Sequence, residues 1–435
     1  MKRKVAFHTL GCKLNFAETS TMARTFPEDK FERVSPDSHA DIYVINTCTV
    51  TDAADRKCRQ TVRKFVHKNP DAFIAVVGCY AQLRQEEAAA IEGVDLVLGT
   101  YEKFDIASYI NNIEKRTAPE IHSCERIDTE GFMSSWSAGD RTRSFLKVQD
   151  GCDYHCSYCT VPLARGSSRN PHIAEIVSEA EAIVGSGVRE IVLTGVNVGD
   201  FGKSTGESLE QLLSRLVKVN GLQRLRLSSI EPNLVSDPVI EMIASEEVLL
   251  PHVHMPLQSG SDRILGLMRR RYRREVFLDR VMKIREKMPH AGIGADVIVG
   301  FPGETDEDHA DTFSFLESLP LSYLHVFAYS PRPGTPAADM PGRVSKQEKE
   351  KRSRQLIKLS ESRRMQFMRS ASGQVQEVLF EQKGADGMVA GLTGNYIRVL
   401  TPWIRDLPGT VRKVRLTTLR GDSSMNGELI QTENI

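Results

Sequence analysis

The sequence predicts an α/β protein with three folded parts: an open parallel α/β domain, a partial β/α barrel and a small all-β barrel. Two observations predict this fold class. From Val5 to Ser330, short β-branched apolar runs alternate with helical patterns, as expected for parallel strands covered by helices. After Gly373 the pattern changes to short strands separated by glycine-rich turns, which is typical of an all-β domain.

Length and charge narrow the possibilities further. A chain of 435 residues is expected to form two or three domains. Lys plus Arg and Asp plus Glu both number 57, so overall charge gives no argument for nucleic acid. No apolar run is long enough to span a bilayer, and the N-terminal MKRKVAFHTLGCKLN turns polar too early for a secretory signal. We therefore expect a cytoplasmic protein whose eight cysteines are ligands, nucleophiles or buried thiols rather than disulfides.

Residues 1–116 are predicted to form the open α/β domain, with helices at 52–68 and 85–93 between its strands. Its strand-like runs are VAFHTL (5–10), DIYVINTC (41–48), FIAVVGC (73–79) and DLVLG (95–99). These runs show little polar alternation, which favours strands buried on both faces. Residues 117–143 are richer in Ser, Thr and Asp, lack sustained periodicity and are expected to form a linker.

Residues 144–344 repeat a strand–helix unit, with helical patterns at 172–184 and 274–288, among others. The strand-like runs are FLKVQ (145–149), IVLTGV (191–196), RLRLSS (224–229), HVHMPL (252–257), IGADVIVGF (293–301) and YLHVFAYS (323–330). A complete β/α barrel needs eight such units. Six units therefore predict a partial, open (β/α)6 barrel.

The last part of the chain divides into a helix and a β domain. Residues 345–372 read as one long basic helix. Residues 373–435 contain the short runs GQVQEVLF, GMVAGL, YIRVLT and TVRKVRLTTL, and predict a small β-barrel of OB-like size.

Cys12, Cys48 and Cys79 each lie at or just after the carboxyl end of a different predicted strand. Carboxyl ends of parallel strands meet at the crevice where open α/β sheets bind ligands, so these thiols are expected to converge. A single free cysteine is most often a small buried hydrophobe. Three at equivalent positions, within TLGCKLN, NTCTVT and VGCYAQ, favour a metal site instead.

The stretch DGCDYHCSYCTVP (150–162) places Cys152, Cys156 and Cys159 in the loop after the first barrel strand, where barrel enzymes carry their chemistry. Zinc could use these three thiolates together with His155. A four-iron cubane is the alternative, because thiolates are its usual ligands. With only three thiolates, one iron of the cluster stays open to a substrate or cofactor. A protein that only carries electrons does not need such an open iron.

This C-x3-C-x2-C run, with Tyr158 before its last cysteine, resembles that of the radical S-adenosylmethionine (SAM) enzymes, in which SAM chelates the open iron. The preceding three-cysteine domain and the β-barrel tail narrow the resemblance to the methylthiotransferases. That family has an N-terminal domain with a second four-iron cluster, a radical SAM barrel and a C-terminal TRAM domain. The resemblance covers essentially the whole chain and implies two 4Fe–4S clusters, one on each cysteine trio.

Three stretches resemble the branch of the family that modifies N6-threonylcarbamoyladenosine in tRNA. They are HTLGCKLN (8–15), NTCTVTDAADRKCRQ (46–60) and CTVPLARGSSRN (159–170). At the first stretch the isopentenyladenosine branch tends to read GCQMN, and the branch acting on a ribosomal protein GCPKN. The implied reaction inserts a methylthio group at C2 of the modified adenosine 37, next to the anticodon. Alternatives are methylthiolation of isopentenyladenosine or of a ribosomal-protein side chain, and an RNA-binding iron–sulfur or zinc protein without catalysis.

The implied mechanism assigns the difficult step to cofactors, because the C2–H bond is not acidic and no general base can remove its hydrogen. The cluster on Cys152, Cys156 and Cys159 is implied to reduce SAM to a 5′-deoxyadenosyl radical. The other cluster is implied to carry the sulfur, which a second SAM methylates. The resemblance also implies a tRNA partner and a one-electron donor such as flavodoxin or ferredoxin. We expect neither DNA nor a membrane as a partner, and a monomer by default.

Further candidates for binding SAM lie at carboxyl ends of barrel strands or in the cysteine loop: Tyr158, Asn197, Ser229, Glu231, Gln258 and Gly300. Tyr158 is expected to pack on the adenine, or only to cover the cluster. Asn197, Ser229 and Glu231 would bond the ribose or the methionine ammonium, or cap a following helix. Gln258 lies in a stretch similar to one that lines this cavity in the family. Gly300 would let the backbone approach the ligand.

RNA contact is expected at the run MRRRYRREV, where arginines surround an aromatic residue. The run contains Arg269, Arg270, Arg271, Tyr272, Arg273 and Arg274. This combination suits phosphates and unstacked bases, although a charge run is often only a solvated face. Its place near the barrel mouth favours RNA, and the basic helix at 345–372 is a second candidate.

Two cysteines, Cys58 and Cys124, receive no ligand role and are expected to be inert thiols.

Overall fold

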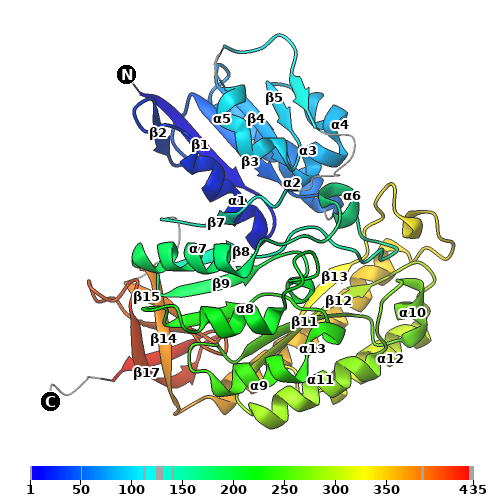
Figure 1. The fold of residues 1–435 in the computed structure, drawn as a ribbon. Coiled ribbons are helices and arrows are strands. Elements are labelled where there is room, and N and C mark those ends of the chain that lie inside the picture. The colour runs from blue at the N-terminus through cyan, green and yellow to red at the C-terminus, as the bar shows by residue number, and fades with distance from the viewer. Residues whose placement is uncertain are drawn as a thin grey trace.

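The N-terminal part of the structure, a computed structural model, is a sheet of six parallel strands in the order β2-β1-β3-β4-β5-β6 (Figure 1). The structure describes residues 2–49, 51–110, 114–123, 131–139, 142–383 and 387–430. The strands are β1 (Arg3–Thr9), β2 (Phe31–Val34), β3 (Ile42–Thr47), β4 (Phe73–Gly78), β5 (Leu96–Leu98) and β6 (Glu120–His122). The helices are α1 (Lys13–Arg24), α2 (Asp52–Lys68), α3 (Cys79–Leu83), α4 (Gln85–Ala89) and α5 (Ile106–Tyr109). An apolar cluster on each face buries β3 and β4 completely, as their continuous apolar runs predicted.

Strands β2 and β6, at the two edges of this sheet, were not predicted. β2 (FERV) and β6 (EIH) are short and partly exposed, so neither shows a continuous apolar run. β6 lies within residues 117–143, as does β7 (Ser135–Trp136), which pairs with the central sheet. The expectation that this segment is only a linker was therefore wrong for its described residues, because it adds one strand to each of two sheets.

The central part is an arc of six parallel strands, with β7 added antiparallel at one edge. The strands are β8 (Arg143–Lys147), β9 (Glu190–Thr194), β10 (Arg224–Leu227), β11 (His252–Gln258), β12 (Gly292–Val299) and β13 (Tyr323–Ala328). One ladder joins β8 to β10 and another joins β11 to β13, with bridges Leu225–Leu249 and Ser229–His254 between them. All six predicted strands are present, and the partial barrel is confirmed.

Helices cover the outer face of this arc (Figure 1). They are α7 (Ile173–Gly185), α8 (Leu209–Leu216), α9 (Asp237–Ser245), α10 (Asp262–Leu267), α11 (Arg274–Lys287) and α12 (Asp306–Ser318). The short helix α6 (Val161–Arg165) follows the cysteine loop and lies between the N-terminal and central parts (Figure 1). Side chains cap several of these helices: the hydroxyl of Ser208, for example, accepts from the backbone N–H of Gln211.

The inner face of the arc is covered partly by the N-terminal domain. Phe145 on β8 and Val192 on β9 point away from the helical layer and pack on Phe16 and Ala17 of α1. The helix that begins beside Cys12 thus supplies part of the core of the central barrel.

The chain then forms α13 (Lys346–Ser370), which packs along β13, and a closed five-stranded barrel. The strands of this C-terminal barrel are β14 (Val375–Lys383), β15 (Met388–Thr393), β16 (Arg398–Pro402), β17 (Val411–Leu419) and β18 (Met425–Leu429). The predicted helix and β-barrel are confirmed, but β18 (MNGEL) was missed because it has little apolar content. No helix among the described residues is sufficiently long and apolar to cross a membrane.

The C-terminal barrel docks on the amino ends of the central strands through the loop between β15 and β16. Arg224 Nη2 donates to the Leu392 carbonyl (3.1 Å) and Arg226 Nη1 to the Gly394 carbonyl (2.8 Å). Gly292 begins β12, and a Cβ there would lie 2.3 Å from the Asn395 carbonyl oxygen. The loop can approach this closely only because position 292 has no side chain.

Candidate functional site

Cys12, Cys48 and Cys79 come together at the carboxyl edge of the N-terminal sheet. Cys12 precedes α1 directly after β1, Cys48 follows β3, and Cys79 begins α3 after β4. These three strands are neighbours in the sheet. Gly11 has φ +110°, and a Cβ there would lie 2.7 Å from Cys48 Cβ. The first two cysteine loops can therefore approach only with glycine at position 11.

Asn15 joins these two cysteine loops from inside α1. Its Nδ2 donates to the Leu10 carbonyl at 2.8 Å and to the Thr47 carbonyl at 3.0 Å. Its Oδ1 lies 3.8 Å from the Cys12 Sγ. A single buried amide thus positions the backbone just ahead of both cysteines.

Cys79 and Cys12 are close enough for their charges to interact. Cys12 keeps exposed surface, but the protein atoms crowded around its sulfur raise the pKa of the thiol. The guanidinium of Arg165 opposes this shift, and a charge on Cys79 adds to it. The first trio is therefore a set of converging thiols beside a buried cation.

Cys152, Cys156 and Cys159 share the loop between β8 and α6. The Sγ atoms of Cys152 and Cys159 each accept a hydrogen bond, at 3.4 Å, from the backbone N–H two residues further along. Arg270 Nη1 donates to Cys156 Sγ at 3.2 Å. N–H donors around a thiolate stabilise its charge and tune a bound cluster. Each sulfur of this trio has such a donor.

Burial raises the pKa of Cys152 to about 11 and that of Cys159 to about 12. A charge on Cys156 adds to both shifts, so the three sulfurs lie near one another. Such thiols give up their protons when a metal binds, because the thiolate is the ligand.

The donor set of each trio indicates which metal it suits. Zinc needs four ligands, and His155, the fourth ligand expected for the second trio, is exposed. Three thiolates suit a four-iron cluster with one iron left open. The donor sets therefore fit four-iron clusters.

A cavity of about 260 Å³ lies where the N-terminal and central parts meet. It is lined by Thr51, Tyr158, Cys159, Thr160, Val161, Gln258, Asp296, Ile298, Phe327, Ala328, Tyr329 and Ser330. Cys159 of the second trio lines the cavity, and Thr51 contributes to the lining from the N-terminal domain. The expected residues Tyr158 and Gln258 both line it. A register shift at the end of β11 and a φ of +68° turn Gln258 towards the cavity.

The other candidates for binding SAM lie outside the lining of this cavity. Asn197 is buried, and neither atom of its amide has a hydrogen-bond partner among the described residues. Ser229 forms a backbone bridge with His254. Glu231 pairs with Arg270, but burial outweighs that charge and raises the pKa of Glu231 to about 7.

Gly300 has a different role from the one expected. It has φ +72°, and a Cβ there would lie 2.3 Å from the side chain of Lys349 on α13. Its N–H donates to Glu304 at 3.0 Å. In this structure the absence of a side chain makes room for α13 rather than for a ligand.

Two members of the arginine-rich run lie inside the protein, which corrects the expectation that the whole run faces RNA. The Arg270 side chain is 3% exposed because it bonds Cys156 and Glu231. Tyr272 is 4% exposed, and its hydroxyl donates to carbonyls of β11. Arg269, directly before Arg270, has φ +57°, in the left-handed region. No signal in the sequence separates the buried members of the run from the exposed ones.

The remaining arginines of the run, Arg269, Arg271, Arg273 and Arg274, keep exposed or half-exposed positions. The Arg271 guanidinium lies 4.1 Å from the centre of the Tyr154 ring, over the cysteine loop.

Cys58 is fully buried, and burial raises its pKa to about 12, as expected for an inert thiol. Cys124 lies outside the described residues.

Sequence reasoning missed a hydrogen-bonded chain on the inner face of β11, β12 and β13. Asp296 accepts from His254 Nε2 at 2.9 Å and from His325 Nδ1 at 3.2 Å. The Tyr323 hydroxyl lies 3.1 Å from His254 Nδ1 and 2.9 Å from His252 Nε2. Burial opposes ionisation of Asp296, but the two imidazoles outweigh it and lower its pKa. Polar residues two apart in HVH and YLH were the available signal.

Two family models match the chain. Residues 4–99 match the uncharacterized protein family UPF0004, and residues 146–316 match the radical SAM superfamily. Among solved structures, the radical SAM methyltransferase TsrM from Kitasatospora setae matches with a TM-score of 0.54 at 16% identity, covering 78% of this chain and 75% of that one. At that identity the likeness shows the fold.

Curated relatives extend over nearly the whole chain. The threonylcarbamoyladenosine tRNA methylthiotransferase MtaB of Bacillus subtilis is 39% identical over 95% of this chain and 93% of its own. MtaB of Aquifex aeolicus is 36% identical over 94% of this chain and 99% of its own. The tRNA-2-methylthio-N6-dimethylallyladenosine synthase of the same organism is 30% identical over 100% of this chain and 96% of its own.

Proposed function

Because the chain belongs to the radical SAM methylthiotransferase family, in its threonylcarbamoyladenosine branch, we propose that it inserts a methylthio group into tRNA. The position is C2 of N6-threonylcarbamoyladenosine, at adenosine 37 beside the anticodon. The observation that carries this proposal is the 39% identity to an MtaB enzyme over almost the full length of both chains. Six cysteines in two converging trios support it.

The choice of branch rests on a comparison within one organism. Aquifex aeolicus has both an MtaB and a dimethylallyladenosine synthase among the relatives of this chain. The chain is 36% identical to the first and 30% identical to the second. This difference favours threonylcarbamoyladenosine over isopentenyladenosine as the substrate.

The cofactors are two 4Fe–4S clusters and SAM. A cluster on Cys152, Cys156 and Cys159 would supply one-electron cleavage of SAM, and one on Cys12, Cys48 and Cys79 would supply the sulfur. The chain itself does not need to remove a proton from C2, since the hydrogen leaves to a radical.

The protein's own residues bind, orient and exclude water. Arg270 and the backbone N–H groups of the cysteine loop hold the thiolates of the second trio. Tyr158 packs edge-on against Phe301, with ring centroids 6.4 Å apart, and covers one side of the cavity. Gln258 and the unpartnered amide of Asn197 offer hydrogen bonds to the polar groups of SAM. Exclusion of water from this cavity would protect a radical from solvent.

The proposal includes the partners. The substrate is tRNA, and the electron comes from a one-electron donor such as flavodoxin or ferredoxin. The exposed arginines Arg269, Arg271, Arg273 and Arg274 and the C-terminal barrel, which we take as a TRAM domain, are the proposed RNA surface. We propose that the enzyme acts as a monomer in the cytoplasm, where it meets tRNA.

The deciding experiment compares tRNA nucleosides from a deletion strain and its parent by mass spectrometry. We expect the methylthio form of threonylcarbamoyladenosine to disappear and unmodified threonylcarbamoyladenosine to rise. The wild-type gene should restore the methylthio form, whereas a Cys156→Ala gene should not. Persistence of this nucleoside in the deletion strain, with loss of the methylthio isopentenyladenosine instead, would assign the other branch.

A further inference from the structure

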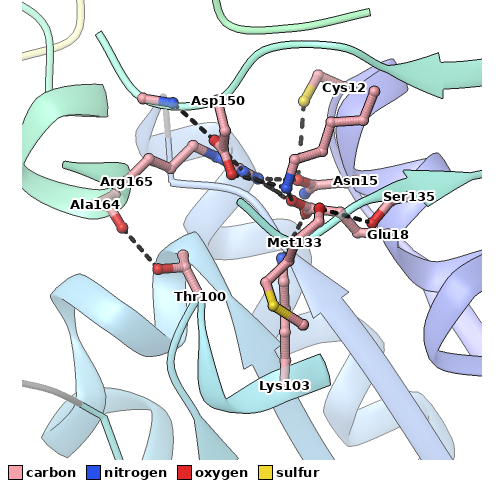
Figure 2. Close-up of polar contacts among 12 residues, drawn as sticks. Cys12, Asn15, Glu18, Thr100, Lys103, Met133, Ser135, Asp150, Ala164 and Arg165 are labelled. Atoms are coloured by element: carbon pink, nitrogen blue, oxygen red, sulfur yellow. Dashed lines mark hydrogen bonds and ion pairs between the residues drawn. The ribbon is translucent and has the colours of Figure 1, made fainter. Parts of the chain in front are cut away.

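Five charged side chains are buried together between the N-terminal domain and the central barrel (Figure 2). Glu18 lies on α1 and Lys103 in the short helix Glu102–Asp105 of the first domain. Lys147 ends β8, Asp150 precedes the second cysteine trio, and Arg165 ends α6. The exposed fraction of each of these side chains is 5% or less.

Glu18 is the centre of the cluster. Its Oε1 accepts from Lys147 Nζ at 3.2 Å and from Arg165 Nη1 at 2.9 Å. Its Oε2 accepts from Lys103 Nζ at 2.5 Å and from Arg165 Nη2 at 3.1 Å. Asp150 in turn binds Arg165 at 3.0 Å and Lys147 at 2.8 Å.

The charges of this cluster do not balance. Glu18 contacts all three buried cations of the cluster and Asp150 contacts two of them, so both carboxylates count as anions here. Against these two anions stand three buried cations, Lys103, Lys147 and Arg165. Glu18 and Asp150 are the only carboxylates that contact them among the described residues. At least one buried positive charge is left over, which is costly without a counter-ion.

The excess charge faces the first cysteine trio. Arg165 Nη2 donates to Asn15 Oδ1 at 2.9 Å, and the same oxygen lies 3.8 Å from Cys12 Sγ (Figure 2). Lys103 binds the same Glu18 carboxylate as Arg165. Arg165 therefore reaches the first trio through one amide, and Lys103 lies beside Arg165 on their shared carboxylate.

We infer that Lys103 and Arg165 are the counter-charge for the first cysteine site and hold a small sulfur anion, of the hydrosulfide or methanethiolate class, against it. A dicationic four-iron core on three thiolates carries one net negative charge, and an anionic sulfur ligand adds a second. The leftover cation offsets one of these two negative charges in a buried region, where the attraction is strong. The inference rests on the proposed function, since it concerns the site that donates the sulfur.

The test uses full-length protein in which Cys152, Cys156 and Cys159 are changed to Ala, so that only the first site takes iron. Lys103→Met removes one cation, Lys103→Arg keeps it, and Lys115→Met is the matched control. Lys115 binds Asp95 in the same domain, at 2.9 Å. After anaerobic reconstitution each variant is titrated with sodium methanethiolate and followed by electron paramagnetic resonance.

We expect Lys103→Met to keep about four irons, to bind methanethiolate about tenfold more weakly, and to have a lower reduction potential, because a nearby positive charge is lost. Lys103→Arg and Lys115→Met should both match the parent. Unchanged affinity and potential in Lys103→Met would overturn the inference.

A second readout needs no cluster. In iron-free protein, Lys103→Met leaves two anions and two cations, so its melting temperature should not fall. Lys115→Met should lower the melting temperature, because the buried carboxylate of Asp95 loses the lysine that binds it. An equal fall in both variants would make Lys103 an ordinary structural lysine and overturn the inference. The methanethiolate titration and the melting temperatures can agree with the inference even if the wild-type protein does not modify tRNA. In that case the proposed function is wrong, but Lys103 and Arg165 still supply the counter-charge of the first cysteine site.

Discussion

Tyr396 of the C-terminal barrel stacks on His252 at the start of β11, with ring centroids 4.6 Å apart and ring planes at 24°. The guanidinium carbon of Arg226 lies 4.7 Å from the centre of the same ring. Tyr396 has φ +76°, a conformation that a bulky residue adopts only when its surroundings impose it. One tyrosine therefore anchors the C-terminal barrel to the inner face of the central strands.

Replacing Tyr396 by Ala should detach this anchor. The variant loses the stacking and cation–π contacts, and we expect unfolding free energy to fall by about 3 kcal/mol. Tyr396→Phe keeps the ring and should stay within about 1 kcal/mol of the wild type. Urea unfolding followed by circular dichroism measures both, and equal losses in the two variants would show that the ring is not the anchor.

Glu190 should make the docking of the C-terminal barrel sensitive to acid. Burial opposes its ionisation, but Arg226 and Arg224 outweigh burial and hold the pKa of Glu190 to about 2, below the usual 4.5. A carboxyl with a lowered pKa adds stability above its unfolded pKa and loses it as pH falls towards the folded pKa. The stability at stake is about 3 kcal/mol.

We therefore expect Glu190→Gln to be less stable than the wild type at pH 7. The difference should shrink as pH falls from 4.5 towards 2, because the wild-type carboxyl then becomes protonated. Urea unfolding across this range measures it. A difference that does not depend on pH would mean that the charge of Glu190 is unimportant.

Gly11→Ala should impair only the first cysteine site. The new Cβ would lie 2.7 Å from Cys48 Cβ, and φ +110° strains any other residue. We expect iron in the reconstituted protein to fall from about eight per chain towards about four. Gly187→Ala is the control, since position 187 has φ +90° but open space around it. Loss of iron in both variants would mean that backbone strain alone explains the effect, and not the contact with Cys48.

Cysteine variants should separate ligands from inert thiols. Changing Cys12, Cys48 and Cys79 to Ala should leave about four irons per chain, whereas Cys58→Ala should keep about eight. Cys58 packs in the apolar core of the first sheet, so its variant should lose about 1 kcal/mol of stability instead. Iron analysis and thermal unfolding test this, and loss of iron in Cys58→Ala would add a ligand to the site.

Arg269 and Arg273 should contribute to tRNA binding through charge. If each contacts one phosphate, Arg→Gln at either position should reduce the slope of log affinity against log salt by about 0.9. Filter binding at several salt concentrations measures this slope. Arg263→Gln, an exposed arginine that binds Asp308 in α12, is the control. Equal slopes in all variants would remove the run from the RNA surface.

The sequence predicted strands well where most of their residues are buried. β3, β4 and five of the six barrel strands are largely buried, and all of these strands were predicted. β13 was also predicted, although it is partly exposed. β2, β6 and β18 are short and contain charged residues, because part of each faces solvent. Local patterns of hydrophobicity do not record such pairing, which depends on neighbouring strands.

The cysteine sites were predictable because their ligands follow strand ends and spacing rules. The contacts between buried polar side chains were not predictable. Arg270 and Tyr272 looked like surface residues, and nothing in the sequence brings Glu18 to Lys147, which is 129 residues away. Buried charges are arranged by tertiary contacts, so they become visible only when the chain is folded.

The packing of Phe16 and Ala17 on Phe145 and Val192 limits how this protein can be engineered. A catalytic fragment cut to begin at β8 would present a bare apolar wall to solvent and is expected to aggregate. A chimera that takes its first hundred residues from a relative must therefore also take the apolar surface of β8 and β9 on which those residues pack. The N-terminal domain and the central barrel must then be exchanged together.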